Sequence, residues 1–253
     1  MANRFEPGQV AVVTGAARGI GLGIARRLAR EGLTVALLDR DAAALEEAVA
    51  SLAGERLEAI GVAVDLTDSS AVNAAFAEII AKAGRIDCLV NNAGAVRDMR
   101  FLKMTDEDWD LVIDTNLRSQ FLCCRAALPD MVERGHGRIV NISSRAWLGG
   151  FGQANYSAAK GGVVSLTRSL AIEFAAKGVT VNAVAPGIVD TPLFRNFAPE
   201  VQSRLQASVP VKRIGTAEDI ANAVVFFLDP AASYVTGQTL YVCGGRSLSS
   251  PSV

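Results

Sequence analysis

Two side chains with acid/base chemistry stand four residues apart in the segment NYSAAK (155–160). On a helix, residues at this spacing share one face, so Tyr156 and Lys160 would lie side by side. A phenol is a poor base at neutral pH, because its ordinary pKa is about 10. A cation about 4 Å away favours the phenolate by roughly 1 to 4 kcal/mol, or about one to three pKa units. The pair therefore predicts that Tyr156 can give or take a proton.

A glycine-rich turn, TGAARGIG (14–21), follows a β-branched segment and opens a helical one. Its glycines Gly15, Gly19 and Gly21 let the backbone turn tightly and approach a pyrophosphate. The helix that follows offers unpaired N–H groups and the positive end of its dipole. The turn therefore predicts a dinucleotide site.

The second β-branched segment ends at Asp39, about twenty residues after the turn, where a carboxylate can accept both hydroxyls of an adenosine ribose. The same carboxylate would repel a 2′-phosphate. Arg18 and Arg40 could bind that phosphate instead. We expect NAD rather than NADP, because Asp39 faces the ribose directly while both arginines can swing into water.

Strand-like and helical segments alternate along the chain. The strand-like segments are 9–14, 34–38, 58–64, 86–91, 137–143, 179–185 and 238–242, and the helical ones are 19–31, 41–53, 68–83, 106–134, 155–177 and 216–228. Caps are expected at Asp41 and Asp68, and capping boxes at Thr105 and Thr216. This alternation predicts a single α/β domain over 1–253, a seven-stranded parallel sheet with helices on both faces.

Two segments break this rhythm. Residues 185–210 contain four prolines together with Phe194 and Phe197, which suits a substrate lid. The C-terminal tail, residues 243–253, is rich in Gly and Ser, and we expect its last residues to be loosely ordered.

Composition excludes several functions. The formal charge is −1, so no positive field favours nucleic acid or an anionic membrane, and no apolar run is long enough to span a bilayer. We expect a soluble cytoplasmic protein. A single histidine, His136, and four cysteines without CxxC spacing argue against a metal site, and His136 precedes a strand at the edge opposite to the expected site.

The motifs together resemble those of the short-chain dehydrogenase/reductase family over essentially the whole chain. They are TGAARGIG (14–21), Asp39, Asp65, NNAG (91–94), Asn116, NISS (141–144), YSAAK (156–160) and APGIVDTP (185–192). The resemblance implies a Rossmann fold, a homotetramer, and hydride transfer between NAD and an alcohol or ketone.

By this resemblance four residues form the catalytic group. Tyr156 is the acid/base, Lys160 also holds the nicotinamide ribose, Asn116 holds a water in a proton relay, and Ser144 hydrogen-bonds the substrate oxygen. The expected cofactor contacts, beyond Tyr156 and Lys160, are Gly15, Arg18, Gly19, Ile20, Gly21, Asp39, Asp65, Leu66, Asn91, Ala93, Gly94, Pro186, Gly187, Ile188 and Thr191.

The catalytic serine can be assigned in two ways. Counting forward from the strand at 137–143, the second serine of NISS, Ser144, matches the family's position. Counting back from Tyr156 by the family's spacing of about thirteen selects Ser143. We expect Ser144, because the end of the strand fixes which serine faces the crevice, whereas a loop can absorb a deletion.

The substrate side contains large apolar residues. A pocket walled by Trp147, Leu148, Phe151 and Phe194 would suit an apolar or alicyclic secondary alcohol. Arg97 or Arg145 could instead pair with a substrate carboxylate. The helix at 111–128 is apolar on several sides, which indicates a subunit interface.

Two alternatives remain open. One is an NADPH-dependent reductase of 3-oxoacyl or similar ketones, favoured by Arg18 and the GQANY segment (152–156). The other is a nucleotide-binding regulator that keeps the fold without turnover. Cofactor preference distinguishes the first, and the effect of Tyr156→Phe distinguishes the second.

Overall fold

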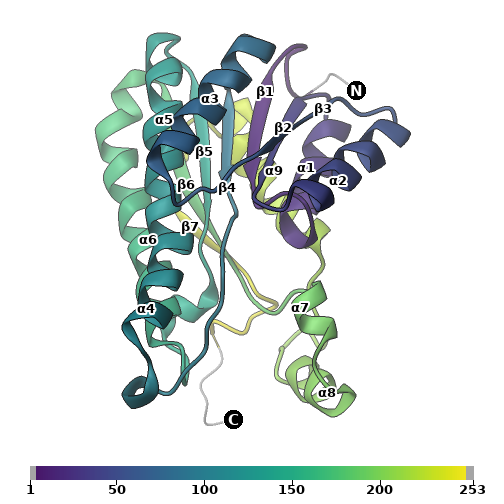
Figure 1. Ribbon diagram of the computed structural model, residues 1–253, viewed down its shortest axis with the longest axis vertical. Coiled ribbons are helices and arrows are strands. Elements are labelled where there is room, and N and C mark those ends of the chain that lie inside the picture. Colours follow the sequence, from purple (N-terminus) through teal and green to yellow (C-terminus); the bar gives the residue numbers. More distant parts are fainter. Residues whose placement is uncertain (1–3, 249–253) are drawn as a thin grey trace.

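A single seven-stranded parallel sheet forms the centre of the protein, in the order β3-β2-β1-β4-β5-β6-β7 (Figure 1). The computed structural model describes residues 4–248. The strands are β1 (Val10–Thr14), β2 (Thr34–Asp39), β3 (Ala59–Ala63), β4 (Cys88–Asn91), β5 (Gly137–Ile142), β6 (Val179–Pro186) and β7 (Thr239–Val242). All seven predicted strands are confirmed. The order reverses between β1 and β4, where parallel sheets of this kind bind their ligands.

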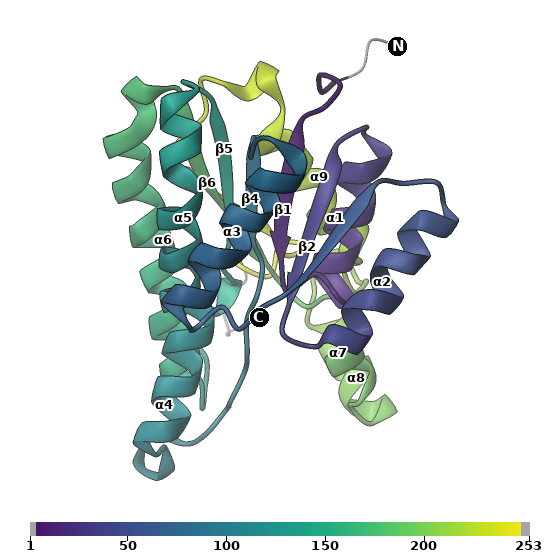
Figure 2. The same ribbon diagram turned by 45° about the horizontal axis from the view of Figure 1, so that its top comes forward.

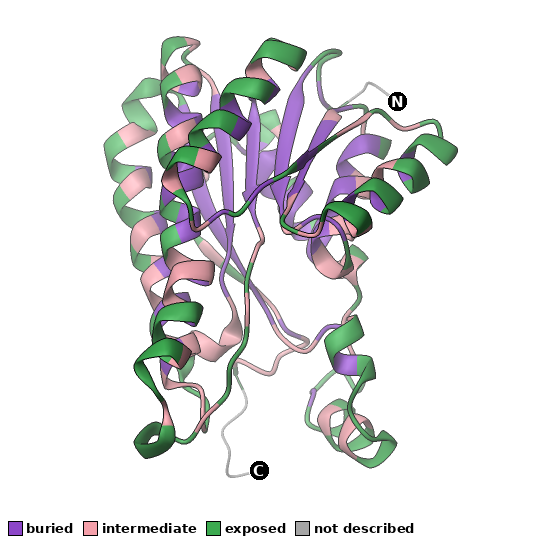
Figure 3. Ribbon diagram, in the orientation of Figure 1, coloured by how far each residue is buried: buried purple, intermediate pink, exposed green. Residues whose placement is uncertain are grey.

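Helices cover both faces of the sheet, as predicted (Figures 1 and 2). The first layer contains α1 (Gly19–Arg30), α2 (Ala42–Gly54) and α9 (Ala217–Leu228), and the second contains α3 (Ser69–Ala83), α5 (Ser119–Glu133) and α6 (Ala154–Phe174). Each layer packs on the sheet through its own apolar core. Burial is concentrated in the strands between them, and the outer helix faces are exposed (Figure 3).

Helix starts follow the predicted capping residues. Asp41 accepts a hydrogen bond from the backbone of α2, and Asp68 accepts two from α3. Thr105 and Thr216 form complete capping boxes. By contrast, α1 begins after Arg18 without any side-chain cap. The first N–H groups of α1 are therefore left for another partner.

The expected single helix at 106–134 is divided. It consists of α4 (Asp106–Ile113), a π-helical turn (Asp114–Arg118) and α5. Single π-turns inside α-helices frequently mark functional sites, because the extra residue changes which side chains face inward. Here the turn contains Asn116.

Beyond the carboxyl ends of the strands lies the segment predicted as a lid. It forms two short helices, α7 (Pro192–Arg195) and α8 (Pro199–Ala207), separated from α4 in both views (Figures 1 and 2). Residues 243–248 of the expected tail form turns, and 249–253 lie outside the described residues. Short 3₁₀ turns occur at Phe101–Lys103, Arg145–Leu148, Ala175–Lys177 and Pro230–Ala232. Between residues 4 and 248, no helix is long and apolar enough to cross a membrane.

Candidate active site

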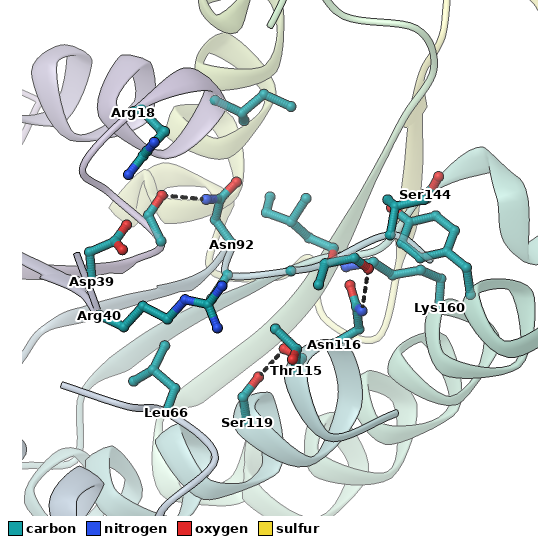
Figure 4. A pocket seen from close by; sticks show the side chains of 18 of the residues that line it. Arg18, Asp39, Arg40, Leu66, Asn92, Thr115, Asn116, Ser119, Ser144 and Lys160 are labelled. Carbon is teal, nitrogen blue, oxygen red and sulfur yellow. Dashed lines mark hydrogen bonds between the residues drawn. The ribbon is translucent and has the colours of Figure 1, made fainter. Parts of the chain in front are cut away.

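A cavity of about 660 Å³ opens at the carboxyl edge of the sheet. Figure 4 shows Arg18, Asp39 and Arg40 on one side of it and Ser144 and Lys160 on the other. The predicted residues that line it are Gly15, Arg18, Ile20, Asp39, Asp65, Leu66, Ala93, Gly94, Asn116, Ser144, Tyr156, Lys160, Pro186, Gly187 and Thr191. The structure therefore brings the cofactor motifs and the acid/base pair together.

Four predicted cofactor residues do not line this cavity. Gly19 and Gly21 shape the turn at the start of α1, and Ile188 borders a separate pocket of about 70 Å³. The side chain of Asn91 is fully buried and donates to Asn141 Oδ1 at 2.9 Å. A contact of Asn91 with the cofactor stays a prediction. The Asn91 side chain is directed into the interior at the end of β4, and Asn92 lines the cavity instead.

The turn after β1 has the shape that a pyrophosphate requires. Gly15 has a φ of +62°, and a Cβ there would lie 2.8 Å from Ala93 Cα. A Cβ on Gly21 would lie 2.1 Å from the carbonyl oxygen of Gly15. Only glycine fits at either position. Together with the uncapped start of α1, this leaves backbone donors accessible to an anion, so the residues present fit a dinucleotide.

The Asp39 carboxylate is fixed at the edge of the cavity. Its Oδ2 accepts from Ala17 N at 3.2 Å, and its Oδ1 accepts from Asp41 N at 3.2 Å. Arg18 is exposed and forms an ion pair with Asp41. A backbone hydrogen bond from Ala44, and then the Arg18 guanidinium, lower the pKa of Asp41. Two carboxylates, Asp39 and Asp41, thus lie at this end of the cavity.

Asp65 provides a second fixed carboxylate in this half of the cavity. Its Oδ1 accepts hydrogen bonds from Thr67 N at 2.9 Å and from Thr67 Oγ1 at 2.7 Å. These bonds lower the pKa of Asp65, so it is ionised at neutral pH. Leu66 beside it is largely buried and gives the cavity an apolar surface next to this charge.

Lys160 lies on α6 at the other end of the cavity, with 2% of its surface exposed. Its Nζ donates to the carbonyl oxygen of Ile142 at 2.9 Å and lies 5.7 Å from the centre of the Tyr156 ring. Burial lowers the pKa of Lys160 to about 7. At neutral pH the amine is therefore present in both its protonated and its neutral form.

The pKa of Tyr156 differs from the prediction. Burial raises the pKa of this phenol, a hydrogen bond with Ser144 lowers it, and the negative charge of Asp98 raises it. The predicted lowering by Lys160 is not found in the cofactor-free protein. Desolvation dominates the phenol, and the same desolvation reduces the charge on Lys160.

The two serines after β5 face different surroundings. Ser143 is 2% exposed, and its Oγ donates to the carbonyl oxygen of Lys160 at 2.8 Å. Ser144 is half-buried, its Oγ accepts from Ala146 N, and its hydroxyl contacts Tyr156. The hydroxyl of Ser144 is thus the one beside the phenol, whereas that of Ser143 supports the helix.

Asn116 reaches the cavity from the π-turn. Its Nδ2 donates to the carbonyl oxygens of Ala95 and Val112, both at 2.8 Å. Its buried Oδ1 has no hydrogen-bond partner among residues 4–248. A Cβ on Gly94 would lie 2.6 Å from this Oδ1 and 3.6 Å from Lys160 Nζ, so glycine keeps the space between them open.

Comparison with known proteins agrees with this geometry. A family model described as Enoyl-(Acyl carrier protein) reductase matches residues 15–247. A crystal structure from Burkholderia xenovorans, provisionally assigned as a short-chain dehydrogenase/reductase, is 36% identical with a TM-score of 0.93, and the match covers 98% of this chain and 100% of that one. The chain belongs to the short-chain dehydrogenase/reductase family.

Two curated relatives of this short-chain dehydrogenase/reductase match nearly its full length. The (2S)-[(R)-hydroxy(phenyl)methyl]succinyl-CoA dehydrogenase subunit BbsD of Thauera aromatica is 45% identical over 95% of this chain and 97% of that protein. The 3-oxoacyl-[acyl-carrier-protein] reductase FabG of Escherichia coli K12 is 41% identical over 95% and 98%. A crystal structure from Agrobacterium tumefaciens, provisionally assigned as a gluconate dehydrogenase, has a TM-score of 0.95 at 35% identity, covering 99% and 100%.

Several cavity residues were not predicted from the sequence. They are Asp41, Val64, Thr67, Asn92, Thr115, Ser119 and Ile142. Most adjoin a motif that was identified. Asn92 belongs to NNAG, and Thr115 and Ser119 flank Asn116. Their position next to a motif in the sequence is therefore the feature from which they could have been predicted.

The predicted apolar substrate wall is not assembled. Trp147 stacks on Tyr241 with ring centres 6.3 Å apart, and Phe194 packs edge-on against Phe197. Leu148 and Phe151 are exposed. None of the four predicted wall residues lines the cavity. Ala95, Val96 and Ile142 are apolar residues that do line the cavity.

The remaining reactive side chains lie away from the cavity. His136 precedes β5 at the amino edge of the sheet, where burial and Arg138 lower its pKa. The four cysteines are buried and unpaired, and burial raises the pKa of Cys88 and Cys124 to about 12. In residues 4–248 no cluster of His, Cys, Asp and Glu could hold a metal ion.

Proposed function

We propose that this short-chain dehydrogenase/reductase interconverts a secondary alcohol and a ketone with NAD(H). The observation that carries the proposal is a single cavity. It joins the glycine turn and Asp39 at one end to Ser144, Tyr156 and Lys160 at the other. The first group would hold the adenosine and phosphates of a dinucleotide, and the second would hold its nicotinamide ribose.

Tyr156 exchanges the proton with the substrate oxygen in this proposal. The nicotinamide, when bound, supplies the hydride acceptor for alcohol oxidation and the hydride donor for ketone reduction. In oxidation, the Tyr156 phenolate takes the hydroxyl proton while the C–H bond gives up its electron pair. In reduction, the phenol returns the proton to the new alkoxide. Ser144, which hydrogen-bonds Tyr156, is placed to hold the same oxygen.

Lys160 and Asn116 support this proton transfer. An ammonium at Lys160 favours the phenolate by opposite charge. The free Oδ1 of Asn116 and the open space at Gly94 suit a polar relay from Lys160 toward solvent. The residues that would hold the cofactor are the cavity residues of the glycine turn, Asp39, Asp65 and Leu66, and the segment at Pro186–Thr191.

NAD rather than NADP follows from the charges at the ribose end. Asp39 is fixed by two backbone donors, and Arg18 is engaged by Asp41. A 2′-phosphate would meet Asp39 and compete with Asp41 for Arg18. Arg40 lines the cavity and is the cation that opposes this preference.

The second candidate is an NADPH-dependent reductase of a 3-oxoacyl or similar ketone. It is favoured by the 41% identity to FabG and by the presence of Arg18 and Arg40 in the cavity wall. Comparison of kcat/KM for NAD and NADP separates the two candidates. A preference for NADP would overturn the NAD assignment.

The substrate is proposed to carry an apolar substituent, because Ala95, Val96 and Ile142 line the same cavity as Tyr156. A panel of cyclic alcohols, hydroxy acids, polyols and 3-hydroxyacyl thioesters assayed with NAD tests this directly. We expect turnover of alcohols with apolar substituents. Turnover confined to polyols would contradict the proposal.

The protein is further proposed to be a cytoplasmic homotetramer. Leu111, Phe121 and Ile172, on α4, α5 and α6, are exposed apolar side chains on one side of the sheet, and Phe226 on α9 is exposed on the other. Two such surfaces suit a closed tetramer with two kinds of interface. Light scattering after size exclusion measures the mass, and a monomer would contradict this assembly.

A further inference from the structure

Gln120 lies in the first turn of α5, four residues after Asn116, and is 1% exposed. Its Nε2 donates to the carbonyl oxygen of Ile142 at 3.2 Å. The same oxygen accepts the hydrogen bond from Lys160 Nζ at 2.9 Å. Two donors from different helices therefore converge on one acceptor at the end of β5.

The orientation of the Gln120 amide follows from the chemistry of this contact. A carbonyl oxygen can only accept, so the NH₂ group must face it. The buried Oε1 has no hydrogen-bond partner among the described residues. An unmet buried acceptor costs stability that an apolar side chain of similar length would avoid. Packing alone therefore does not account for a glutamine at this position.

We propose that Gln120 is a positioning residue for Lys160, acting through the shared carbonyl oxygen of Ile142. The oxygen divides its electron density between two donors, and the positive end of the Gln120 amide points at the same atom. Both effects weaken the hold of this carbonyl on the Lys160 ammonium. The inference rests on the proposed role of Lys160 beside Tyr156.

The surroundings of Lys160 make this carbonyl its main polar contact. Burial alone accounts for its lowered pKa, with no charged side chain contributing. The titratable neighbour is Tyr156 on the same helix, and Asp98 acts on Tyr156 from the loop after β4. Asn116 presents its neutral Oδ1 near Gly94. A change at Gln120 therefore reaches Lys160 without passing through an ion pair.

Removing the competing donor should favour the ammonium. A change of about 10 to 30% in the strength of a hydrogen bond to a charged group corresponds to an acid dissociation constant about 1.3 to 5 times lower. Gln120→Met should therefore raise the pKa of Lys160. The melting temperature should be unchanged or higher, because the unmet Oε1 is removed.

The experiment is an NMR titration of the lysine Nζ signals in the ¹⁵N-lysine-labelled, cofactor-free protein. The chain has five lysines, and the signal lost in Lys160→Met identifies Lys160. Thr167→Val is the matched control, since Thr167 is fully buried and its hydroxyl contacts Val163 and Asn141 rather than Ile142. We expect the Lys160 pKa to rise in Gln120→Met and to stay at the wild-type value in the control.

An unchanged or lower Lys160 pKa in Gln120→Met would overturn the proposal. If that variant does not fold, Gln120→Asn keeps an amide too short to reach Ile142 and should give the same rise. The titration needs neither cofactor nor turnover. Its failure would refute the role of Gln120 alone, whereas the proposed function is tested separately by the turnover of Tyr156→Phe.

Discussion

Replacing Lys160 with methionine should change how the stability of the protein depends on pH. Burial lowers the pKa of Lys160 from its ordinary 10.5 to about 7 in the folded protein. Between these values the unfolded chain binds a proton that the folded chain has released, so the free energy of unfolding rises with pH. From about pH 7 to about pH 9, this linkage amounts to about 2 kcal/mol.

The assay is urea unfolding at both pH values, followed by the fluorescence of Trp109 and Trp147. The stability of the wild type relative to Lys160→Met should increase by about 2 kcal/mol from the lower pH to the higher. Lys177→Met removes an exposed lysine and should keep the wild-type pH dependence. If the free energy of unfolding had the same pH dependence in the wild type and Lys160→Met, the lowered pKa of Lys160 would be refuted.

Three further experiments test the site. Ser144→Ala should lower kcat by about 10² to 10³, whereas Ser143→Ala should leave kcat nearly unchanged and cost about 1 kcal/mol of stability; the reverse pattern would reassign the catalytic role. Gly21→Ala should abolish NADH binding, because its Cβ would lie 2.1 Å from a backbone oxygen. Gly54→Ala, with open space around it, should bind NADH normally and gain about 0.4 to 1 kcal/mol of stability. Equal NADH affinity in the two variants would contradict the role of Gly21 in the turn that is proposed to hold the pyrophosphate. Asp39→Asn should raise kcat/KM for NADP relative to NAD by roughly tenfold or more, and an unchanged ratio would show that another group selects the cofactor.

The fold was accessible from the sequence because its signals are local. Runs of β-branched residues mark each strand, and Asp41, Asp68, Thr105 and Thr216 mark the starts of four helices. The order of the strands is not local, since pairing depends on residues far apart in the chain. That β1 pairs with β4 rather than β3 is a result of the structure.

The π-turn at Asp114–Arg118 was not predicted. One extra residue in a helical turn hardly disturbs the apolar pattern of 106–134, so periodicity cannot detect it. Its consequence is specific, because the turn places the Nδ2 of Asn116 between two backbone carbonyls. The family motif identified Asn116 without revealing how the helix presents it.

The predictions of the site differ from the structure where the direction of a single side chain, or its burial, decides what it contacts or how it titrates. Asn91 ends β4 and is buried, whereas the next residue, Asn92, lines the cavity, and the motif NNAG does not reveal this difference. The raised pKa of Tyr156 depends on desolvation, which no sequence spacing reports. Trp147 lies in a 3₁₀ turn and stacks on Tyr241, and Phe194 lies in α7 and packs against Phe197; neither contact could be predicted from the sequence.

The turnover of Tyr156→Phe, measured together with its NADH affinity, tests the central claim most directly. The substitution removes only the hydroxyl that is proposed to exchange the proton. We predict that kcat falls by about 10² or more while the Kd for NADH changes by no more than about threefold. Turnover equal to that of the wild type, with NADH still bound, would contradict the assignment of Tyr156 as the acid/base group.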